Sequence, residues 1–376
     1  MSKKLANEKE IERNRLEKKW KGVIQLVSAL NVKNAGGASS SEEIELFSCF
    51  YLGEAELEKT IEETFKKHGN FLHLKIQSEA LKQAYSYLSA ALTAAKKAKN
   101  KYPRLLQDTV LLLSKYHFVI GDYDNCLMYI RSMEDISLEG MPRRSKCIFS
   151  EAFACKAIAL ELQGDATIDE MNKDAIQAYE RAGEIALAIC IEEEKQGSMK
   201  RNVSTATSSH TTLSKLMEFA MLRPGHMFAE SGMVDDAIQN YRALLKIIET
   251  KATANTRKMA CRYLAQILLS CSCSQLYTPP SSMSDSISRS NSNTVTMMST
   301  PRKDSPDLFA NNSLKRNTLT DSMFCPQDEV EETLLVLLIA EALHLQQSEV
   351  KHTEEDSVSK ERVLNETNMI YDSNLY

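Results

Sequence analysis

The sequence predicts an all-α protein in which helix hairpins stack into a solenoid, and three observations lead to this expectation. The 376 residues include only 12 Gly and 8 Pro, and 43% of them are hydrophobic. Leu, Ala, Glu and Lys are frequent, and these residues favour helix. Apolar residues also recur at helical spacing, and three segments repeat one pattern around a turn glycine.

Residues 1–98 form the first expected region, which is helical. Ile11, Trp20, Ile24 and Leu30 recur at helical spacing, so we expect one helix over residues 5–30. A Gly- and Ser-rich break follows at residues 35–41. The next expected helices are a short one beginning near Glu42, one over residues 54–67, and a long amphipathic one over residues 77–98.

Residues 99–275 form the second region, where the hairpins lie. The tetratricopeptide repeat is a hairpin of about 34 residues with small residues where its helices cross. The first candidate turns at Gly121, which can end a helix in the left-handed conformation without a Cβ penalty. Tyr123 is expected to pack over this turn, and Cys126 is small where a neighbouring helix crosses.

Two further hairpins repeat this pattern of small, large, glycine, small and aromatic residues. The second turns at Gly164 and resumes its register at Ala175 and Tyr179, after an insertion within Asp165 to Asp174. The third is the cleanest. It has a small residue at Gly225, the turn at Gly232, and small and large residues at Ala237 and Tyr241.

The remaining residues divide into three parts. Residues 276–323 are rich in Ser, Thr and Pro, and we expect a disordered loop. Residues 324–350 should continue the solenoid with a helix over 329–348, capped by Asp328 with Glu331 three residues on. Residues 351–376 are expected to be a weakly ordered, truncated tail. Their weak helical pattern, Val358 to Tyr371, has no cap and no clear hydrophobic partner.

The chemistry-bearing residues predict no enzyme, no cofactor and no metal site. No nucleotide, metalloprotease or nucleophile-elbow motif is present. The carboxylates and the basic residues near the N-terminus are expected on solvated helix faces, and His117 is expected to pack. The nine cysteines form no CxxC pair and read as small buried hydrophobes.

Charge and hydropathy restrict the partners. The net charge of -5 argues against nucleic acid. No apolar run approaches the roughly 20 residues of a membrane span, and no signal peptide is evident. We therefore expect a cytoplasmic protein that meets membranes only indirectly. The 276–323 loop offers phosphorylation candidates at Thr278, Ser292, Thr300 and Ser305, which either precede a proline or lie three residues after a basic residue.

Several stretches together resemble the N-terminal half of the tetratricopeptide repeat protein 7 family. They are spread from about residue 50 to 345. The stretches are Leu52-Gly53-Glu54 with Leu57-Glu58, Gly121-Asp122-Tyr123, Glu151-Ala152, Tyr179 to Leu187, Leu244-Leu245 with Glu249-Thr250, Ala265 with Ile267 to Leu269, and Phe324 to Gln327 with Glu331-Glu332 and Leu334.

This resemblance implies an adaptor of the type III alpha phosphatidylinositol 4-kinase. The implied partners are the kinase catalytic subunit, a hyccin-like subunit and a palmitoylated membrane anchor, at the plasma membrane. Family members extend beyond the point where this chain stops, so a fragment, a truncated gene model and a short isoform are all open. The alternative is a chaperone-binding repeat domain. Its cationic clamp is not expected, because Lys115 is the one lysine or arginine at the clamp positions.

Overall fold

The structure is a computed structural model. It describes residues 2–34, 41–98, 101–133, 136–164, 169–200, 213–247, 249–270, 277–280 and 326–346. Every regular element within these ranges is a helix, so the predicted all-α class is confirmed. The chain divides into two compact units, Met1–Pro224 and Gly225–Tyr376, here called unit one and unit two.

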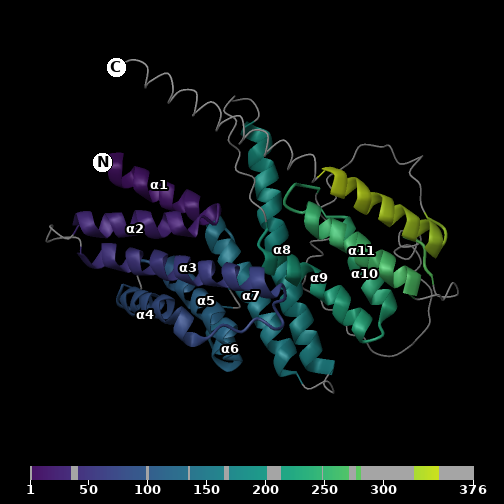
Figure 1. Ribbon diagram of the computed structural model, residues 1–376, viewed down its shortest axis with the longest axis horizontal. Helices are drawn as coiled ribbons and strands as arrows, with labels where there is room; N and C mark the ends of the chain where they lie inside the picture. The colour runs from purple at the N-terminus through teal and green to yellow at the C-terminus, as the bar shows by residue number, and fades with distance from the viewer. Residues whose placement is uncertain are drawn as a thin grey trace, which may run out of the picture. The chain divides into compact units, whose positions relative to one another are not determined.

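In unit one, each helix packs on its neighbour in the chain. Contacts join α1 to α2, α2 to α3, α3 to α4, α4 to α5, α5 to α6 and α7, and α7 to α8 (Figure 1). This serial packing is the arrangement that a hairpin solenoid requires. The helices are α1 (Ser2–Leu16), α2 (Trp20–Asn34), α3 (Ser41–His68), the 3₁₀ turn η1 (Ser78–Leu81), α4 (Lys82–Lys97), α5 (Pro103–Ile120), α6 (Tyr123–Arg131), α7 (Arg143–Gln163), α8 (Asp169–Lys200) and the first part of α9 (Lys215–Glu230).

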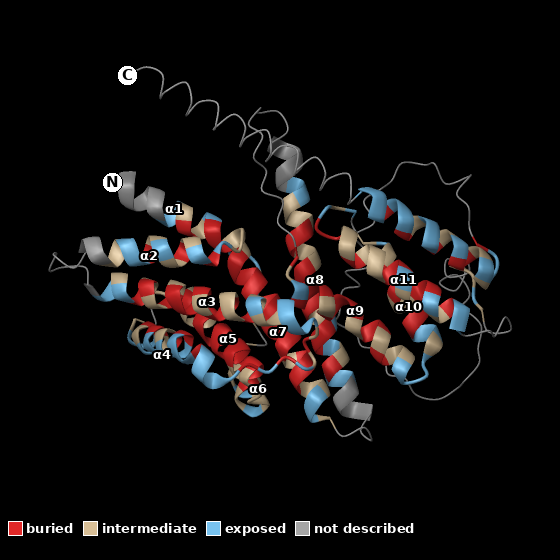
Figure 2. Ribbon diagram, viewed as in Figure 1, coloured by how far each residue is buried: buried red, intermediate tan, exposed pale blue. Residues whose placement is uncertain are grey.

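The core of unit one runs along α5 and α7, where buried residues occupy nearly the whole circumference (Figure 2). Leu111, Leu112 and Leu113 are consecutive and all buried, as are Ile148 and Phe149. A helix that is buried all round has neighbours on every side. Any charged residue on these two helices must therefore find its partner inside the protein.

The expectation of one helix over residues 5–30 is wrong. The chain breaks after Leu16, where Lys18 has a positive φ of 57° and Lys19 donates its N–H to the Asn14 carbonyl at 2.8 Å. Ile11 and Trp20 then meet in one buried cluster with residues of α2 and α3. The apolar spacing continues through the break, so it could not reveal that the chain folds back on itself.

Two helices are longer than the sequence indicated. The helices expected near Glu42 and over 54–67 form the single helix α3. Gly53 lies in the middle of α3. An added Cβ there would lie 2.8 Å from Leu88 Cγ of α4, so a larger residue would clash where these two helices cross. The Ser- and Thr-rich sequence from Lys195 to Thr212 favours a loop, but α8 continues to Lys200. Residues 201–212 lie outside the described residues.

Unit two begins within α9 and continues with α10 (Val234–Leu245), α11 (Ala254–Ser270) and a helix over residues 329–346, which is yellow in Figure 1. The last helix starts with the expected cap. Asp328 Oδ1 accepts the N–H groups of Val330 and Glu331 at 3.0 and 2.9 Å, and Glu331 Oε2 accepts the Gln327 N–H at 2.8 Å. This reciprocal capping fixes where the helix begins.

A buried ion pair attaches the helix over residues 329–346 to α10. Arg242 Nε and Nη2 donate to the two oxygens of Glu332 at 2.8 and 2.6 Å, which is a bidentate contact. The ring of Tyr277 lies 5.6 Å from the Arg242 guanidinium. Arg242 therefore contacts residues on both sides of the sequence between 281 and 325, which lies outside the described residues.

Candidate functional site

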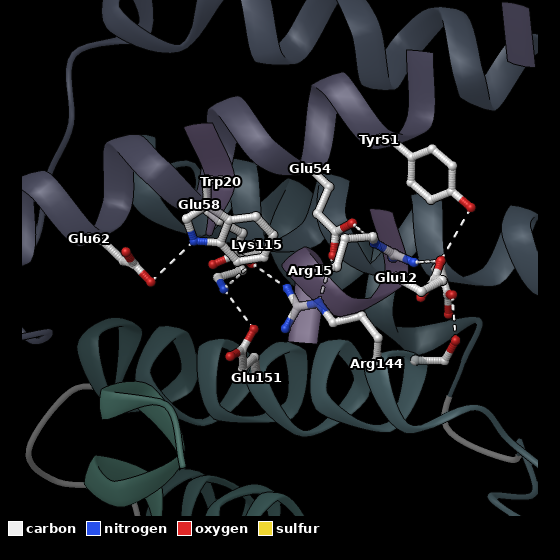
Figure 3. Close-up of polar contacts among 12 residues, drawn as sticks. Glu12, Arg15, Trp20, Tyr51, Glu54, Glu58, Glu62, Lys115, Arg144 and Glu151 are labelled. Carbon is white, nitrogen blue, oxygen red and sulfur yellow. Dashed lines mark hydrogen bonds and ion pairs between the residues drawn. The ribbon is translucent and has the colours of Figure 1, made fainter. Parts of the chain in front are cut away.

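Six buried charged residues of unit one form a continuous set of ion pairs, here called the charged network (Figure 3). They come from four helices, and none is more than 5% exposed. Three are cationic and three anionic, so the charges balance within the protein. The members are Arg15 of α1, Glu54 and Glu58 of α3, Lys115 of α5, and Arg144 and Glu151 of α7.

The first half of the charged network is centred on Glu54. One carboxylate oxygen accepts Arg15 Nε at 2.6 Å, and the other accepts Arg144 Nε at 2.7 Å. Glu54 is 0% exposed, so both of its hydrogen-bonding partners come from the protein. One carboxylate thus joins α1, α3 and α7, which are distant in sequence.

The second half is centred on Lys115. Its Nζ donates to Glu58 Oε1 at 2.6 Å and to Glu151 Oε2 at 2.8 Å. Arg144 Nη2 donates to the same oxygen of Glu58 at 3.3 Å, which makes the two halves continuous. Lys115 therefore joins α5 to α3 and α7.

The pKa values of the carboxylates show how the charges are held. Burial alone would raise the pKa of Glu54, but Arg15 and Arg144 outweigh burial and keep it below its ordinary value. Burial is likewise outweighed by Lys115 and Arg144 at Glu151, whose pKa falls to about 2. At Glu58, burial and the negative charge of Glu151 prevail over Lys115 and raise the pKa. Glu58 is therefore the carboxylate of the network that protonates first as the pH falls.

Aromatic rings cover the arginines of the charged network. The Arg144 guanidinium lies 5.2 Å from the Trp20 ring, and that of Arg15 lies 4.9 Å from Tyr51 and 5.2 Å from Phe50. Such cation–π contacts favour a cation over bare apolar surroundings. Trp20 also donates its Nε1–H to Glu62 at 3.2 Å, which orients the ring.

A separate buried carboxyl lies between α5 and α7. Asp108 is 6% exposed and accepts a hydrogen bond from the Ser145 hydroxyl at 2.6 Å. Burial raises the pKa of Asp108 to about 6, and the Ser145 hydrogen bond offsets only part of this effect. Asp108 therefore titrates well above an ordinary aspartate.

The arrangement is suited to holding helices in one register. Each network member is paired, and removing one would leave a buried charge without compensation, at a cost of about 3–5 kcal/mol. Within the described residues, His, Cys, Asp and Glu side chains form no group of three or more that could hold a metal ion. The described part of the chain also has no helix long and apolar enough to cross a membrane.

The first predicted turn has the geometry that its glycine suggests. Gly121 ends α5 with φ 84°, in the left-handed region. Asp122 caps α6 by accepting the Asn125 N–H, and its other oxygen lies 2.9 Å from His117 Nδ1. The ring of Tyr123 lies 6.2 Å from that of Phe118 across the turn.

The second turn differs in its backbone. Gly164 follows α7 with φ −66° and ψ 124°, an extended conformation open to other residues. Residues 165–168 of the expected insertion lie outside the described residues, and α8 begins at Asp169. Tyr179 is fully buried in α8, and its hydroxyl donates to Glu161 at 2.6 Å.

The third turn again has a left-handed glycine, with Gly232 at φ 75°. Tyr241 is fully buried against Gly225, where an added Cβ would lie 2.5 Å from Tyr241 Cζ. The small position of one helix thus receives the large residue of the next, as the repeat pattern predicts for a helix crossing.

The phosphorylation candidates fall on both sides of the described boundary. Thr278 is described, exposed and followed by Pro279 in non-helical backbone. Ser292, Thr300 and Ser305 lie outside the described residues, as does all of the expected loop except residues 277–280.

The charged network is what sequence reasoning missed. Its carboxylates, and Arg15 near the N-terminus, were expected on solvated faces, and that expectation is wrong for these residues. One signal was present, because Glu54, Glu58 and Glu151 all fall within the stretches that carry the family resemblance.

The stacked helix hairpins identify the class of this protein as a helical-repeat scaffold of the tetratricopeptide type. The family described as Tetratricopeptide repeat protein 7 N-terminal matches residues 1–374, and the chain belongs to this family.

Three relatives show how the chain compares with whole family members. It is 28% identical to Tetratricopeptide repeat protein 7B of Homo sapiens over 382 residues, which cover 97% of this chain and 42% of the relative. The identity is also 28% to protein 7A of Homo sapiens, with 93% and 42% covered, and to protein 7B of Mus musculus, with 97% and 42% covered. The chain thus spans less than half the length of these relatives.

Proposed function

We propose that this chain is a non-enzymatic adaptor that helps to assemble and localise a phosphatidylinositol 4-kinase complex at the plasma membrane. The observation that carries the proposal is family membership over residues 1–374. The partners are those that the resemblance implies: the type III alpha kinase catalytic subunit, a hyccin-like subunit and a palmitoylated anchor. The chain itself is cytoplasmic in this proposal, and its partners bring it to the membrane.

The character of the fold supports an adaptor. The charged residues of the core are paired with one another, so they stabilise the scaffold and leave its outer helix faces for partners. A solenoid binds through a broad surface of this kind rather than through a deep pocket.

The alternative is a chaperone-type module that captures a C-terminal carboxylate, and the structure argues against it. Lys115 is the one lysine or arginine at the expected clamp positions, yet it is 4% exposed. Its ammonium is already held by Glu58 and Glu151 at 2.6 and 2.8 Å. A peptide carboxylate would have to displace both of these buried partners.

Affinity purification of the full tagged chain from cells tests the proposal. We expect the kinase catalytic subunit to co-purify with the wild type and with Lys82→Met, a change at an exposed site. Lys115→Met should recover less of the kinase, because the loss of about 3–5 kcal/mol of stability leaves a larger fraction of unit one unfolded. The proposal fails if the kinase is absent and only chaperones are recovered, in a manner lost on adding a competing C-terminal peptide.

We also propose phosphorylation of the segment that begins at Thr278. This residue is exposed and precedes Pro279, so a proline-directed kinase can reach it. Incubation with such a kinase should label the full chain at Thr278, as mapped by mass spectrometry, and Thr278→Val should remove that label. Labelling that never includes Thr278 would contradict the proposal.

A further inference from the structure

Arg242 of α10 is buried, and one of its guanidinium nitrogens has no hydrogen-bond partner among the described residues. Its side chain is 7% exposed. Nε and Nη2 donate to Glu332 at 2.8 and 2.6 Å, whereas Nη1 is buried and makes no hydrogen bond to the described part of the chain. Leaving a buried donor unpaired is costly, so a free nitrogen at this position needs an explanation.

The free nitrogen points away from Glu332. A guanidinium is planar, and its three nitrogens are spread evenly around Cζ. Because the edge formed by Nε and Nη2 faces the carboxylate, Nη1 lies on the opposite side of Cζ. A second anion at Nη1 would therefore meet the cation where repulsion from Glu332 is weakest.

An arginine shared by two anions is already present in unit one. Arg144 donates Nε to Glu54 at 2.7 Å and Nη2 to Glu58 at 3.3 Å. Both carboxylates are buried, so this fold holds a guanidinium between two negative groups. Arg242 pairs with Glu332 through one edge and retains a donor for a second anion.

A phosphorylation candidate lies next to this arginine in space. The Tyr277 ring is 5.6 Å from the Arg242 guanidinium. Burial and the Glu332 carboxylate raise the pKa of the Tyr277 hydroxyl while Arg242 lowers it, so the hydroxyl lies near the same ion pair. Thr278 follows Tyr277 directly, and adjacent Cα atoms are about 3.8 Å apart. A group attached to Thr278 is thus tethered close to Arg242.

A phosphate on Thr278 has the chemistry that the free donor requires. Thr278 is exposed and precedes Pro279 in non-helical backbone, so a kinase can reach it. The kinase moves the terminal phosphoryl group of ATP onto Thr278 Oγ1, which gives up its proton, and ADP leaves. The product carries a charge of about −1.5 to −2 at neutral pH and three acceptor oxygens. Arginine binds such oxygens through charge-assisted hydrogen bonds.

We propose that phosphorylated Thr278 binds the Nη1 group of Arg242 and thereby fastens the helix over residues 329–346 to α10. Arg242 then lies between two anions, with Glu332 on one side and the phosphate on the other. This inference deepens the phosphorylation proposed at Thr278 and rests on it for the origin of the phosphate. The attachment of the helix over residues 329–346 is thus under the control of a kinase.

Hydrogen–deuterium exchange of the full chain tests the fastening. Phosphothreonine is incorporated at position 278 by genetic code expansion, so this test judges the contact even if no kinase labels Thr278. We expect the backbone amides of residues 329–346 to exchange about tenfold more slowly than in the unmodified chain, because a charge-assisted contact must break before the helix opens. The amides of α4 in unit one are the internal control and should be unchanged. Equal or faster exchange over residues 329–346 would overturn the proposal.

The phosphate itself reports its partner. Contact with a guanidinium favours the dianion, so the second pKa of the phosphothreonine should fall about one unit below its usual value of about 6. Titration followed by ³¹P NMR compares the folded chain with the same chain in urea, and this comparison needs no variant. An equal pKa in the two states would reject the contact.

Arg242→Lys tests the part played by the free nitrogen. The ammonium keeps a cation for Glu332 but lacks the planar fork of the guanidinium. Circular dichroism checks that the variant keeps its helix content. The slowing of exchange caused by the phosphate should shrink from about tenfold to less than about threefold. Undiminished slowing in Arg242→Lys would contradict the assignment to Nη1.

Discussion

Unit one buries charged side chains, whereas the helix over residues 329–346 of unit two exposes apolar ones. The six members of the charged network are at most 5% exposed. Five apolar side chains of the helix over residues 329–346 are at least 44% exposed, namely Val330, Leu334, Leu337, Leu338 and Leu345. Each buried charge is paired with an opposite charge inside the protein. The apolar side chains of that helix lie at the surface, and this difference separates residues that hold the scaffold from residues that face outward.

The largest expected effect comes from breaking the charged network. Lys115→Met keeps the length of the side chain but leaves Glu58 and Glu151 facing each other without their shared cation. We expect the free energy of unfolding to fall by about 3–5 kcal/mol, as measured by urea denaturation followed by circular dichroism.

Lys82→Met provides the matched control. Lys82 and its partner Glu79 are 79% and 80% exposed. The loss should be below about 1 kcal/mol, because solvent screens such pairs. Similar losses in the two variants would remove the distinction between buried and exposed pairs.

The pH dependence of stability isolates the buried carboxyl of Asp108. Its pKa of about 6 in the folded state lies above the ordinary value of 3.8, so the folded state binds the proton more tightly. The resulting stability is complete below about pH 4 and is lost as the pH rises through 6. Between pH 4.5 and 7.5 the wild type should lose about 2 kcal/mol relative to Asp108→Asn. Parallel pH profiles of the two proteins would show that Asp108 is not perturbed.

Close packing in unit two predicts an intermediate effect. At Gly225→Ala the new Cβ would lie 2.5 Å from Tyr241 Cζ, so we expect a loss of about 1–3 kcal/mol despite the better helix propensity of Ala. Gly183 is also helical, but its added Cβ would lie 3.4 Å from Met221 Cγ. Gly183→Ala should therefore be neutral or slightly stabilising. Thermal unfolding compares the two, and equal shifts would contradict the crossing at Gly225.

The smallest effect is expected at the turn glycines. Gly232 has φ 75° and nothing near its added Cβ, so Gly232→Ala measures the backbone alone and should cost about 1 kcal/mol. Gly164 has φ −66°, and Gly164→Ala should cause no loss in the same thermal experiment. If both variants lose stability equally, the difference between the turns has no energetic meaning.

The fold class and most helices could be predicted because they depend on local spacing. Asp328 and Glu331 identified a helix start, and the capping hydrogen bonds are present. The break at Lys18 could not be predicted, because no Gly or Pro marks it and the apolar spacing runs through it. It depends on contacts that α1 makes with α3, which are distant in sequence.

The charged network could not be predicted for a related reason. A glutamate on a helix looks the same in sequence whether it faces water or an arginine. Glu54 and Arg144 are 90 residues apart, and nothing local indicates that they meet. Three of the carboxylates lie in the stretches that carry the family resemblance, but the resemblance does not indicate that they are buried.

A double-mutant cycle between Glu54 of α3 and Arg144 of α7 tests the central claim, that paired buried charges hold the helices of unit one together. Urea denaturation of the wild type, Glu54→Gln, Arg144→Met and the double variant gives the coupling energy between the two side chains. The account predicts a favourable coupling of about 1–3 kcal/mol. A coupling near zero, with additive losses in the double variant, would contradict it.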